Sequence, residues 1–319
     1  MSSRSGLVPA RSLPSQVAPG QASRISRTAP WIFILIWASG YVVAKAAAPH
    51  ADPLSFLIVR YAGVVVVMAA LAAAARAPWP SSRAEVLHLA VAGIGIQAGY
   101  LGCVWVAIKW GMPAGLVALI VNLQPVLTAV AGPMVGERVR PRQWLGLGLG
   151  FSGVALVVSS KLGGGTGVTA GGLGLTVAAL VSMTAGTLYQ KRYCPTFDLR
   201  TGQVIQFAAS IAVTAPFALA SEELRIEWTP EVIAAMAWSI FVLTGGGISL
   251  LFLMIRHGAA TEVTSYMYLV PPVAALLAWL MFGEVLPPAA AVGMAITIAG
   301  VALVVSRRRS TRGAAAGQS

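Results

Sequence analysis

Polar side chains inside long apolar runs are the residues of this chain best suited to bind a small solute. A polar group surrounded by apolar residues is costly unless it is paired, so such positions mark a ligand pathway. The candidates are Asn122, Gln124, Gln97, Tyr100, Tyr266, Tyr268, Ser39 and Tyr41. Gln97 fits a hydrogen bond between two helices as well as a ligand contact. The small hydroxyl of Ser39 is weak support on its own.

Prolines follow the two most polar of these sites. Pro125 comes directly after Gln124, and the pair Pro271-Pro272 comes shortly after Tyr268. A proline removes one backbone donor and leaves a carbonyl free one turn earlier, which kinks or unwinds a helix. Prolines also bend helices for packing alone. Because these recur at equivalent positions in two parts of the chain, we expect Pro125, Pro271 and Pro272 to break helices that line a cavity and gate it.

Four charged residues lie near the ends of apolar runs. Lys45 and Lys109 would attract an anionic or carboxylate-bearing solute at an outer mouth, although reaching for lipid headgroups explains them as well. Glu137 and Glu284 each follow a glycine at the end of a run. We expect these two carboxylates to hold loops in place or to contact the N-termini of neighbouring helices.

Arg60 differs from these residues because it lies about two turns inside its apolar run. It needs an internal partner, such as Asp52 or the C-terminus of a helix, so we interpret it as a structural clamp. No carboxylate occurs near the middle of a run, which gives little support to a buried carboxylate proton relay. Glu262, His88 or ionisation of the substrate could still couple transport to protons.

The sequence shows no grouping typical of a metal site, a cofactor site or an enzyme. The three histidines and two cysteines are scattered, so no metal ligand set is expected. Residues 148–153 fit the GxGxxG spacing, but they lie in an apolar run with no preceding strand, so they do not indicate a dinucleotide site. No nucleophile, base and acid occur together at a common depth. We expect no metal, no cofactor and no catalysis.

Composition places the chain in a lipid bilayer. Of its 319 residues 57% are apolar and 10% are charged, with a mean hydropathy of +0.79, whereas soluble domains carry about a quarter charged residues. The net charge of +12 does not indicate nucleic acid, because the basic residues are spread over tails and short loops between apolar runs.

Ten apolar runs have the length of membrane spans, for which about 20 residues are needed. We expect an all-α polytopic membrane protein with helices near 28–48, 54–75, 84–108, 113–135, 142–160, 170–190, 201–220, 231–255, 261–283 and 287–306. The expected organisation is a disordered basic tail (1–27), a first five-helix unit (28–160), a glycine-rich linker (161–169), a second five-helix unit (170–306) and a basic tail (307–319). Residues 1–27 also fit a targeting peptide or an over-long start, so their presence in the mature protein stays open.

The two units are copies of one another. Shifting the sequence by 147 residues lays 111–159 on 258–306 without a gap, with 16 of 49 positions identical, and the earlier parts align at an offset of 146. At that second offset Gly40 aligns with Gly186, Lys45 with Lys191, and Arg60 with Gln206. Two copies of one structural unit are the simplest explanation.

The distribution of Lys and Arg predicts the orientation. With ten spans, 17 of these residues fall on one side and four on the other, with Arg60 inside a span. The richer side is cytoplasmic by the positive-inside rule, so both termini are expected in the cytoplasm. Because each copy has five spans, an odd number, the second copy lies inverted relative to the first. Inverted repeats suit alternating access to a site near the middle of the membrane.

The chain resembles the EamA-type exporters of the drug/metabolite transporter superfamily. The resemblance covers about 28–306 and rests on Trp37 to Lys45, Pro53 to Ala62, Ala107 to Ala114, Pro125 to Glu137 and Pro272 to Glu284. It implies a cavity lined by helices 1, 3, 4, 6, 8 and 9, with helices 5 and 10 peripheral. It also implies export of small metabolites, often amino acids or related compounds.

The expected function is a multi-pass carrier of the cytoplasmic membrane that exports a small organic metabolite. The expected partners are this solute and the lipid bilayer, and nucleic acid is not among them. Two alternatives remain open: an integral-membrane enzyme acting on lipid and a scaffold that transports nothing. The substrate, the coupling ion and the oligomeric state do not follow from the sequence.

Overall fold

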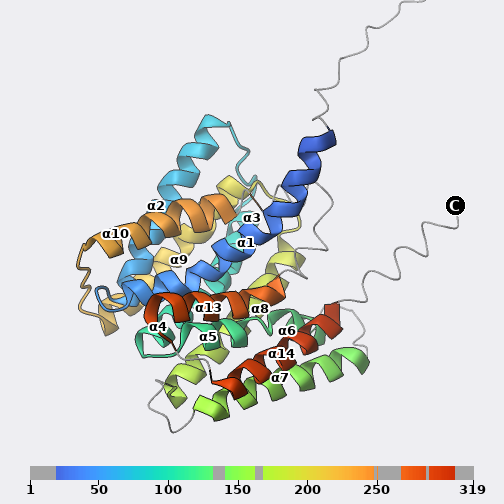
Figure 1. Ribbon diagram of the computed structural model, residues 1–319. Coiled ribbons are helices and arrows are strands. Elements are labelled where there is room, and N and C mark those ends of the chain that lie inside the picture. The colour runs from blue at the N-terminus through green and yellow to red at the C-terminus, as the bar shows by residue number, and fades with distance from the viewer. Residues whose placement is uncertain are drawn as a thin grey trace, which may run out of the picture.

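The computed structural model describes residues 19–131, 141–161, 168–247, 250, 267–284 and 287–305. Within these ranges every element is a helix, and the one β contact is an isolated antiparallel bridge between Ala51 and Ile226. The all-α class expected from the sequence is therefore confirmed. The α-helices are α1 (Pro19–Ala47), α2 (Pro53–Ala74), α3 (Arg83–Gly93), α4 (Tyr100–Lys109), α5 (Ala114–Val121), α6 (Gln124–Val130), α7 (Pro141–Lys161), α8 (Ala170–Tyr193), α9 (Leu199–Ser221), α10 (Pro230–Ala237), α13 (Val270–Phe282) and α14 (Pro288–Val305) (Figure 1).

Four continuous helices are long and apolar enough to cross a membrane. They are Pro53–Ala74, Arg83–Lys109, Ala170–Tyr193 and Leu199–Ser221, of 22 to 27 residues. Six shorter apolar helices of 10 to 17 residues accompany them, at Trp31–Ala47, Ala114–Thr128, Trp144–Ser159, Pro230–Gly246, Val270–Phe282 and Pro288–Leu303. Many large apolar side chains on these helices are exposed, among them Val66 and Phe217. An outer surface of this kind is stable where lipid replaces water.

Capping residues fix where several helices begin. Ser82 accepts a hydrogen bond from the backbone of Glu85, Thr169 from that of Gly172, and Asp198 from that of Arg200. Each satisfies a backbone donor that the first turn of a helix leaves free. At the other end of α13, Gly283 adopts a left-handed conformation with φ of 65°, which glycine tolerates at a helix C-terminus.

Irregular turns lie within or next to four of the apolar helices. A π-helical segment, η1 (Ile94–Gly99), lies between α3 and α4, and a second, η3 (Trp238–Gly246), follows α10. Residues 122–123 separate α5 from α6, and a short 3₁₀ turn, η4 (Met267–Leu269), precedes α13. Such turns leave backbone carbonyls outside the regular α pattern and often occur at functional sites. At the offset of 146, η1 aligns with residues 240–245, which lie within η3, and at the offset of 147 residues 122–123 align with 269–270.

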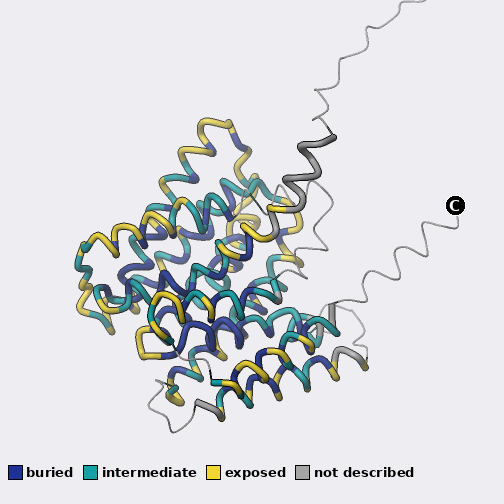
Figure 2. Tube along the Cα trace, in the orientation of Figure 1, coloured by how far each residue is buried: buried dark blue, intermediate teal, exposed yellow. Residues whose placement is uncertain are grey.

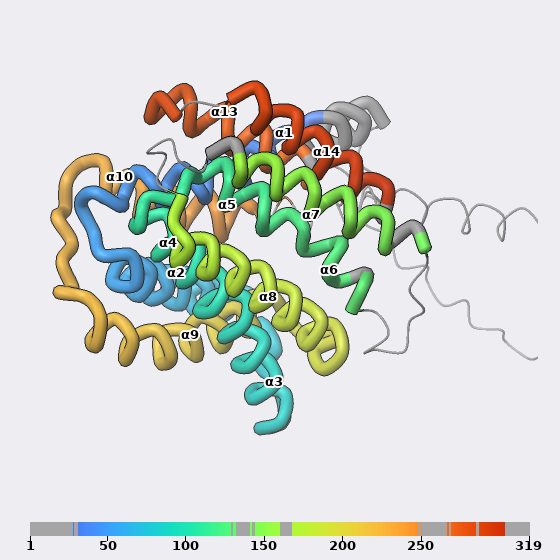
Figure 3. Tube along the Cα trace, turned by 90° about the horizontal axis from the view of Figure 1, so that it is seen from below, coloured from blue at the N-terminus to red at the C-terminus, as the bar shows by residue number. Residues whose placement is uncertain are grey.

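The helices α7 and α14 lie side by side along one edge of the molecule (Figures 1 and 3). A Cβ atom added to Gly153 would collide with Gly293 and Thr297, and one added to Gly300 would lie 2.8 Å from the carbonyl oxygen of Gly146. Gly146 therefore faces Gly300 while Gly153 faces Gly293, so the two helices run antiparallel. Small residues at these four positions let the backbones approach closely.

The remaining helices enclose an apolar core. Burial is deepest where α1, α2, α4 and α5 meet, and the outer faces of the helices are exposed (Figure 2). Close backbone approaches join η1 to α8, where Gly95 meets Gly186, and α3 to α9, where Gly93 meets the backbone of Gln206. These contacts set the spacing of the helices that carry the polar residues considered next.

Candidate functional site

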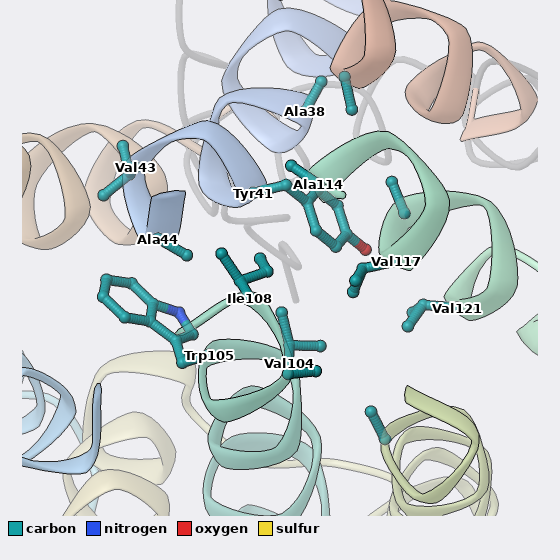
Figure 4. Packing of buried hydrophobic residues seen from close by; sticks show 14 of the residues in the cluster. Ala38, Tyr41, Val43, Ala44, Val104, Trp105, Ile108, Ala114, Val117 and Val121 are labelled. Carbon is teal, nitrogen blue, oxygen red and sulfur yellow. The ribbon is translucent and has the colours of Figure 1, made fainter. Parts of the chain in front are cut away.

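Two of the predicted binding residues meet in the core. Tyr41 of α1 and Tyr100 of α4 are both buried, and their hydroxyl oxygens are 3.2 Å apart. Figure 4 shows the Tyr41 ring extending from α1 toward α5, beside Ala114 and Val117. One hydroxyl donates to the other, which leaves the second O–H proton of the pair free for another acceptor.

Gln97 contributes its backbone to this region. It lies in the π-helical segment η1, and its carbonyl oxygen accepts a hydrogen bond of 2.8 Å from the hydroxyl of Tyr61 on α2. The same carbonyl oxygen also accepts a hydrogen bond from the backbone N–H of Tyr100 at the end of the π turn. Gln97 itself is half-buried. The backbone of this residue thus links η1 to α2, and the role of the Gln97 side chain stays a prediction.

Asn122 and Gln124 flank the break between α5 and α6. The Asn122 side chain donates to the carbonyl oxygen of Ala118 at 2.8 Å, and Gln124 Nε2 donates to Thr187 Oγ1 of α8 at 3.4 Å. Both are half-buried. Asn122 thereby caps the C-terminus of α5. Gln124, the residue before Pro125, bonds instead to the second half of the chain.

Ser39 connects α1 with η3. It accepts a hydrogen bond of 2.9 Å from the indole nitrogen of Trp238 and donates one of 2.7 Å to the carbonyl oxygen of Ile36. The hydroxyl is therefore fully used in this structure. Trp238 was not among the residues singled out from the sequence, because an isolated tryptophan near a helix end usually belongs to an interfacial belt.

The two lysines expected at the outer mouth are engaged with the protein. Lys45 forms an ion pair with Glu284, which also accepts a hydrogen bond of 3.3 Å from the backbone of Ala114 at the start of α5. Lys109 donates to the carbonyl oxygens of Ala48 and Ala51, at 2.6 and 3.2 Å. Glu284 thus joins α1, α5 and the end of α13, and Lys109 holds the loop after α1.

Asp52, one of the two partners that the sequence suggested for Arg60, does not pair with it in the structure. The carboxylate of Asp52 accepts from the backbone of Arg225 instead, at 2.9 Å. Arg60 is buried, with 7% of its surface exposed, and its Nε has no hydrogen-bond partner. Within the described part of the chain it forms no ion pair.

The second proline site is described only in part. Pro271 is buried and Pro272 half-buried at the start of α13, directly after η4. Tyr268 belongs to η4, but its side chain lies outside the described residues, as do Tyr266 and Glu137. Whether the tyrosines of this site face Asn122 and Gln124 is therefore still a prediction.

A second polar region lies at the other end of the bundle. His88 Nδ1 and the Tyr189 hydroxyl are 2.8 Å apart, and the His88 ring stacks on Tyr193. A pocket of about 350 Å³ lies nearby, lined by Pro78, Trp79, Pro80, Ser81, Glu85, Leu89, Tyr193, Cys194, Pro195, Thr196, Phe197, Asp198 and Thr201. The Arg200 guanidinium lowers the pKa of the Asp198 carboxyl, and burial raises the pKa of the Cys194 thiol. A thiol of raised pKa is a poor nucleophile.

Metal chemistry finds no support in the described residues, which contain no group of three or more His, Cys, Asp or Glu side chains placed to hold an ion. Of the predicted binding side chains, the structure brings the phenols Tyr41 and Tyr100 into contact, whereas the amides of Asn122 and Gln124 bond to Ala118 and Thr187. Such groups can bind a small polar solute and release it again.

Comparison with known proteins agrees with this arrangement. The sequence model of the EamA-like transporter family matches the chain twice, over residues 29–159 and 170–306. The chain belongs to the EamA-like transporter family. The resemblance drawn from the sequence motifs is thereby confirmed, and the family is one of membrane transporters.

Two relatives and one solved structure illustrate the likeness. An inner membrane transporter of Escherichia coli K12 is 25% identical over 85% of this chain and 87% of its own. A probable amino-acid metabolite efflux pump of Salmonella typhimurium is 25% identical over 85% of this chain and 91% of its own. A crystal structure that is 20% identical superposes on 92% of this chain and 100% of its own with a TM-score of 0.60, which shows the fold alone.

Proposed function

We propose that this protein is a secondary transporter that exports a small organic metabolite by alternating access between two inverted five-helix halves. One observation carries the proposal. Gly146 of α7 faces Gly300 of α14, and Gly153 faces Gly293. At the offset of 147, Gly146 corresponds to Gly293 and Gly153 corresponds to Gly300. Each glycine therefore faces the equivalent of the other one. Reciprocal contacts between equivalent residues of antiparallel helices are what a two-fold axis in the membrane plane produces. The double match to the family supports the same division.

Ten spans follow from this proposal. The six shorter apolar helices would cross the membrane together with the four long ones, each half supplying five. The charge distribution supports placing both termini in the cytoplasm of a cell with the protein in its inner membrane. Under this orientation the loop after α1 and the loop after α9 share the outer side, in accord with the Ala51–Ile226 bridge between them.

The two sides of the membrane differ in how firmly they are closed. On the proposed outer side, Glu222 accepts from the backbone of Leu54 and Ser55 and from the Ser55 hydroxyl, all at 2.8 Å. The Lys45–Glu284 ion pair adds a second link between the halves. On the proposed cytoplasmic side the equivalent loops border the 350 Å³ pocket. These contacts support a conformation closed toward the outside.

The substrate would bind between the halves, near the helix breaks. Asn122, Gln124, Gln97, Tyr100 and Tyr41 would supply hydrogen bonds from the described region, and Tyr266 and Tyr268 from the second proline site. Gln124 already bonds across the halves to Thr187, so a solute that replaces this bond would sense their separation. The relatives named for amino-acid export support an amino acid or a related compound as the substrate class.

Two experiments test the proposal. Cells that overproduce the protein should accumulate at least one extracellular metabolite relative to cells with an empty vector, and purified protein in liposomes should move that metabolite. Gln124→Ala and Tyr100→Phe should reduce transport without loss of folded protein. A protein that turns over lipid but moves no solute in liposomes would instead be a membrane enzyme, and one whose variants leave every extracellular metabolite unchanged would be a scaffold.

A further inference from the structure

The buried guanidinium group of Arg60 is the feature that the proposed site leaves unexplained. The helix α2 begins at Pro53, and Arg60 follows seven residues later. At the rise of an α-helix, Arg60 lies about 10 Å along the axis from the N-terminus of α2. It is more than nine-tenths buried, and its Nε is buried without a hydrogen-bond partner. Arginine stays charged in a protein interior. A buried, unpaired charge is costly, so the position requires a counter-charge that the described chain does not supply.

In the second half of the chain, the residue equivalent to Arg60 has a hydrogen-bond partner. Gln206 aligns with Arg60 at the offset of 146 and is also buried, but its Nε2 donates to Gln190 Oε1 at 3.0 Å. The residue that aligns with Gln190 in the first half is Ala44. Ala44 is buried and has no side-chain acceptor. In Figure 4 it extends from α1 toward the side of the cluster where Trp105 and Ile108 lie. At this pair of positions the two halves differ: Gln206 has a side-chain partner in Gln190, whereas the aligned residue Ala44 offers none to Arg60.

Two lysines of the proposed outer half of the bundle are already bound within the protein. Lys45 is paired with Glu284, and Lys109 binds two backbone carbonyl oxygens. The Arg60 Nε, in contrast, has no acceptor in the described part of the chain. The Tyr41–Tyr100 pair retains one O–H proton for an outside acceptor, and α4, which carries Tyr100, packs against α2, which carries Arg60.

From these contacts we infer that Arg60 binds the carboxylate of the transported solute, with the Tyr41–Tyr100 hydroxyl pair donating a further hydrogen bond to it. A guanidinium group binds a carboxylate through two parallel N–H donors. One cation matches one negative charge, which favours a monocarboxylate over a doubly charged phosphate. The inference rests on the proposed transport function and names the substrate class: metabolites that carry a single carboxylate next to an apolar or zwitterionic body.

Ligand binding tests the inference without any knowledge of the natural substrate. The full-length protein in detergent is unfolded thermally in the presence of butyrate, benzoate or phenylalanine, with sodium chloride at equal ionic strength and the neutral analogues butyramide and benzamide as controls. A ligand that binds only the folded state raises its melting temperature. We expect the carboxylates to raise it and the amides to have no effect. Equal stabilisation by carboxylate and by chloride, or none by any carboxylate, would overturn the inference.

Substitutions at Arg60 assign the effect to this residue. Arg60→Gln should raise the half-saturating carboxylate concentration about tenfold or more, because a charge-assisted hydrogen bond is lost. Arg60→Lys should keep part of the affinity. The double variant Arg60→Gln with Ala44→Gln copies the Gln206–Gln190 pair, so it should regain thermal stability but not carboxylate binding. Recovery of binding in this double variant would refute the role of the charge.

A last pair of measurements separates this inference from the proposed function. Glu262 lies in a predicted span outside the described residues, and Glu262→Gln should leave carboxylate binding intact. An equal loss in Glu262→Gln and Arg60→Gln would identify Arg60 as the partner of a fixed carboxylate and would contradict the inference. Wild-type protein that binds carboxylates but exports nothing would refute transport alone. Wild-type protein that exports amides and amines as well as acids, with Arg60→Gln unchanged, would refute the role of Arg60 alone.

Discussion

Lys45 and Glu284 show how a charge near a membrane surface can serve the protein and not the lipid. Snorkelling to headgroups would leave Lys45 free, whereas the structure pairs it with a carboxylate 239 positions away. The two side chains are 29% and 14% exposed, so the pair lies between the buried and surface cases. Removing this pair should therefore reduce the free energy of unfolding more than removing an exposed pair does, but less than removing a fully buried pair.

We expect Lys45→Ala to destabilise the protein by about 1–2 kcal/mol, because Glu284 would lose its counter-charge in a half-buried position. Glu284→Ala should cost a similar amount. Thermal unfolding in detergent measures both. The exchanged variant Lys45→Glu with Glu284→Lys should recover part of the loss, and single and exchanged variants of equal stability would show that the pair contributes only through packing.

The loop after α9 gives a residue-scale prediction of pH dependence. A hydrogen bond from His50 and the charge of Arg225 lower the pKa of the Glu227 carboxyl below its ordinary value of 4.5. A carboxyl with a lowered folded-state pKa stabilises the protein above its unfolded-state pKa, and this contribution disappears as the pH falls through the folded-state pKa. Wild type should thus be more stable than Glu227→Gln at neutral pH, with the difference shrinking below about pH 4.5. A difference that does not shrink as the pH falls below the ordinary value of 4.5 would contradict this account.

At the scale of the elements, the sequence predicted where helices break but not which side chains pair between helices. Prolines and glycines mark the breaks at 122–123 and before α13, because they act on the backbone next to them. The contacts Ser39–Trp238 and Gln124–Thr187 join residues 199 and 63 positions apart. Nothing local encodes such distances. The π-helical segments η1 and η3 also escaped prediction, since a π turn and an α turn bury the same apolar residues.

The close approach of α7 and α14 yields an element-scale prediction with a matched control. Gly153→Val would place a side chain against Gly293 and Thr297, whereas a Cβ atom at Gly148 of the same helix meets nothing within 4 Å. We expect Gly153→Val to destabilise the protein by about 1–3 kcal/mol through overpacking. Gly148→Val should stay within about 0.5 kcal/mol of wild type. Thermal unfolding compares the two, and equal effects would exclude tight packing as the reason for Gly153.

Helix capping provides a second element-scale prediction. Asp198 caps α9, where its carboxylate accepts from the backbone of Arg200 at 2.9 Å and pairs with the Arg200 side chain. Asp198→Ala should lower stability by about 1 kcal/mol, while Asp198→Asn should retain most of it because asparagine also caps helices. A loss of equal size in both variants would assign the effect to charge. Because Asp198 also lines the 350 Å³ pocket, both variants should be compared at constant detergent and lipid.

At the scale of the whole molecule, the sequence predicted the family and the all-α class, and the arrangement of the halves depends on contacts it could not give. The repeat and the uneven distribution of Lys and Arg are properties of the full chain. Both can be recognised in the sequence because the two copies kept their turn residues. The contacts of the candidate site residues did not follow from the sequence. Arg60 was interpreted as a clamp because a buried arginine normally has a partner. Only the structure shows that its Nε has none in the described part of the chain, and that the aligned Gln206 bonds to Gln190.

Topology is the prediction that belongs to this scale. Single cysteines placed in the loop 222–231 should react with a membrane-impermeant thiol reagent in intact cells, in a background in which Cys103 and Cys194 are replaced. Cysteines placed in either terminal tail should react only after the membrane is opened. Labelling of a tail from outside would reverse the proposed orientation and with it the assignment of export.

The exchange of Gly146 and Gly153 with Gly293 and Gly300 across the α7–α14 contact also bears on the origin of the chain. A surface that meets its own copy in this way is self-complementary. A single five-helix half made alone would therefore present to a second identical half the face that it now presents to its fused neighbour. The present chain can be understood as a homodimer of antiparallel subunits whose genes became joined. Residue differences such as Ala44 and Gln190 became possible only after the fusion allowed the two subunits to diverge.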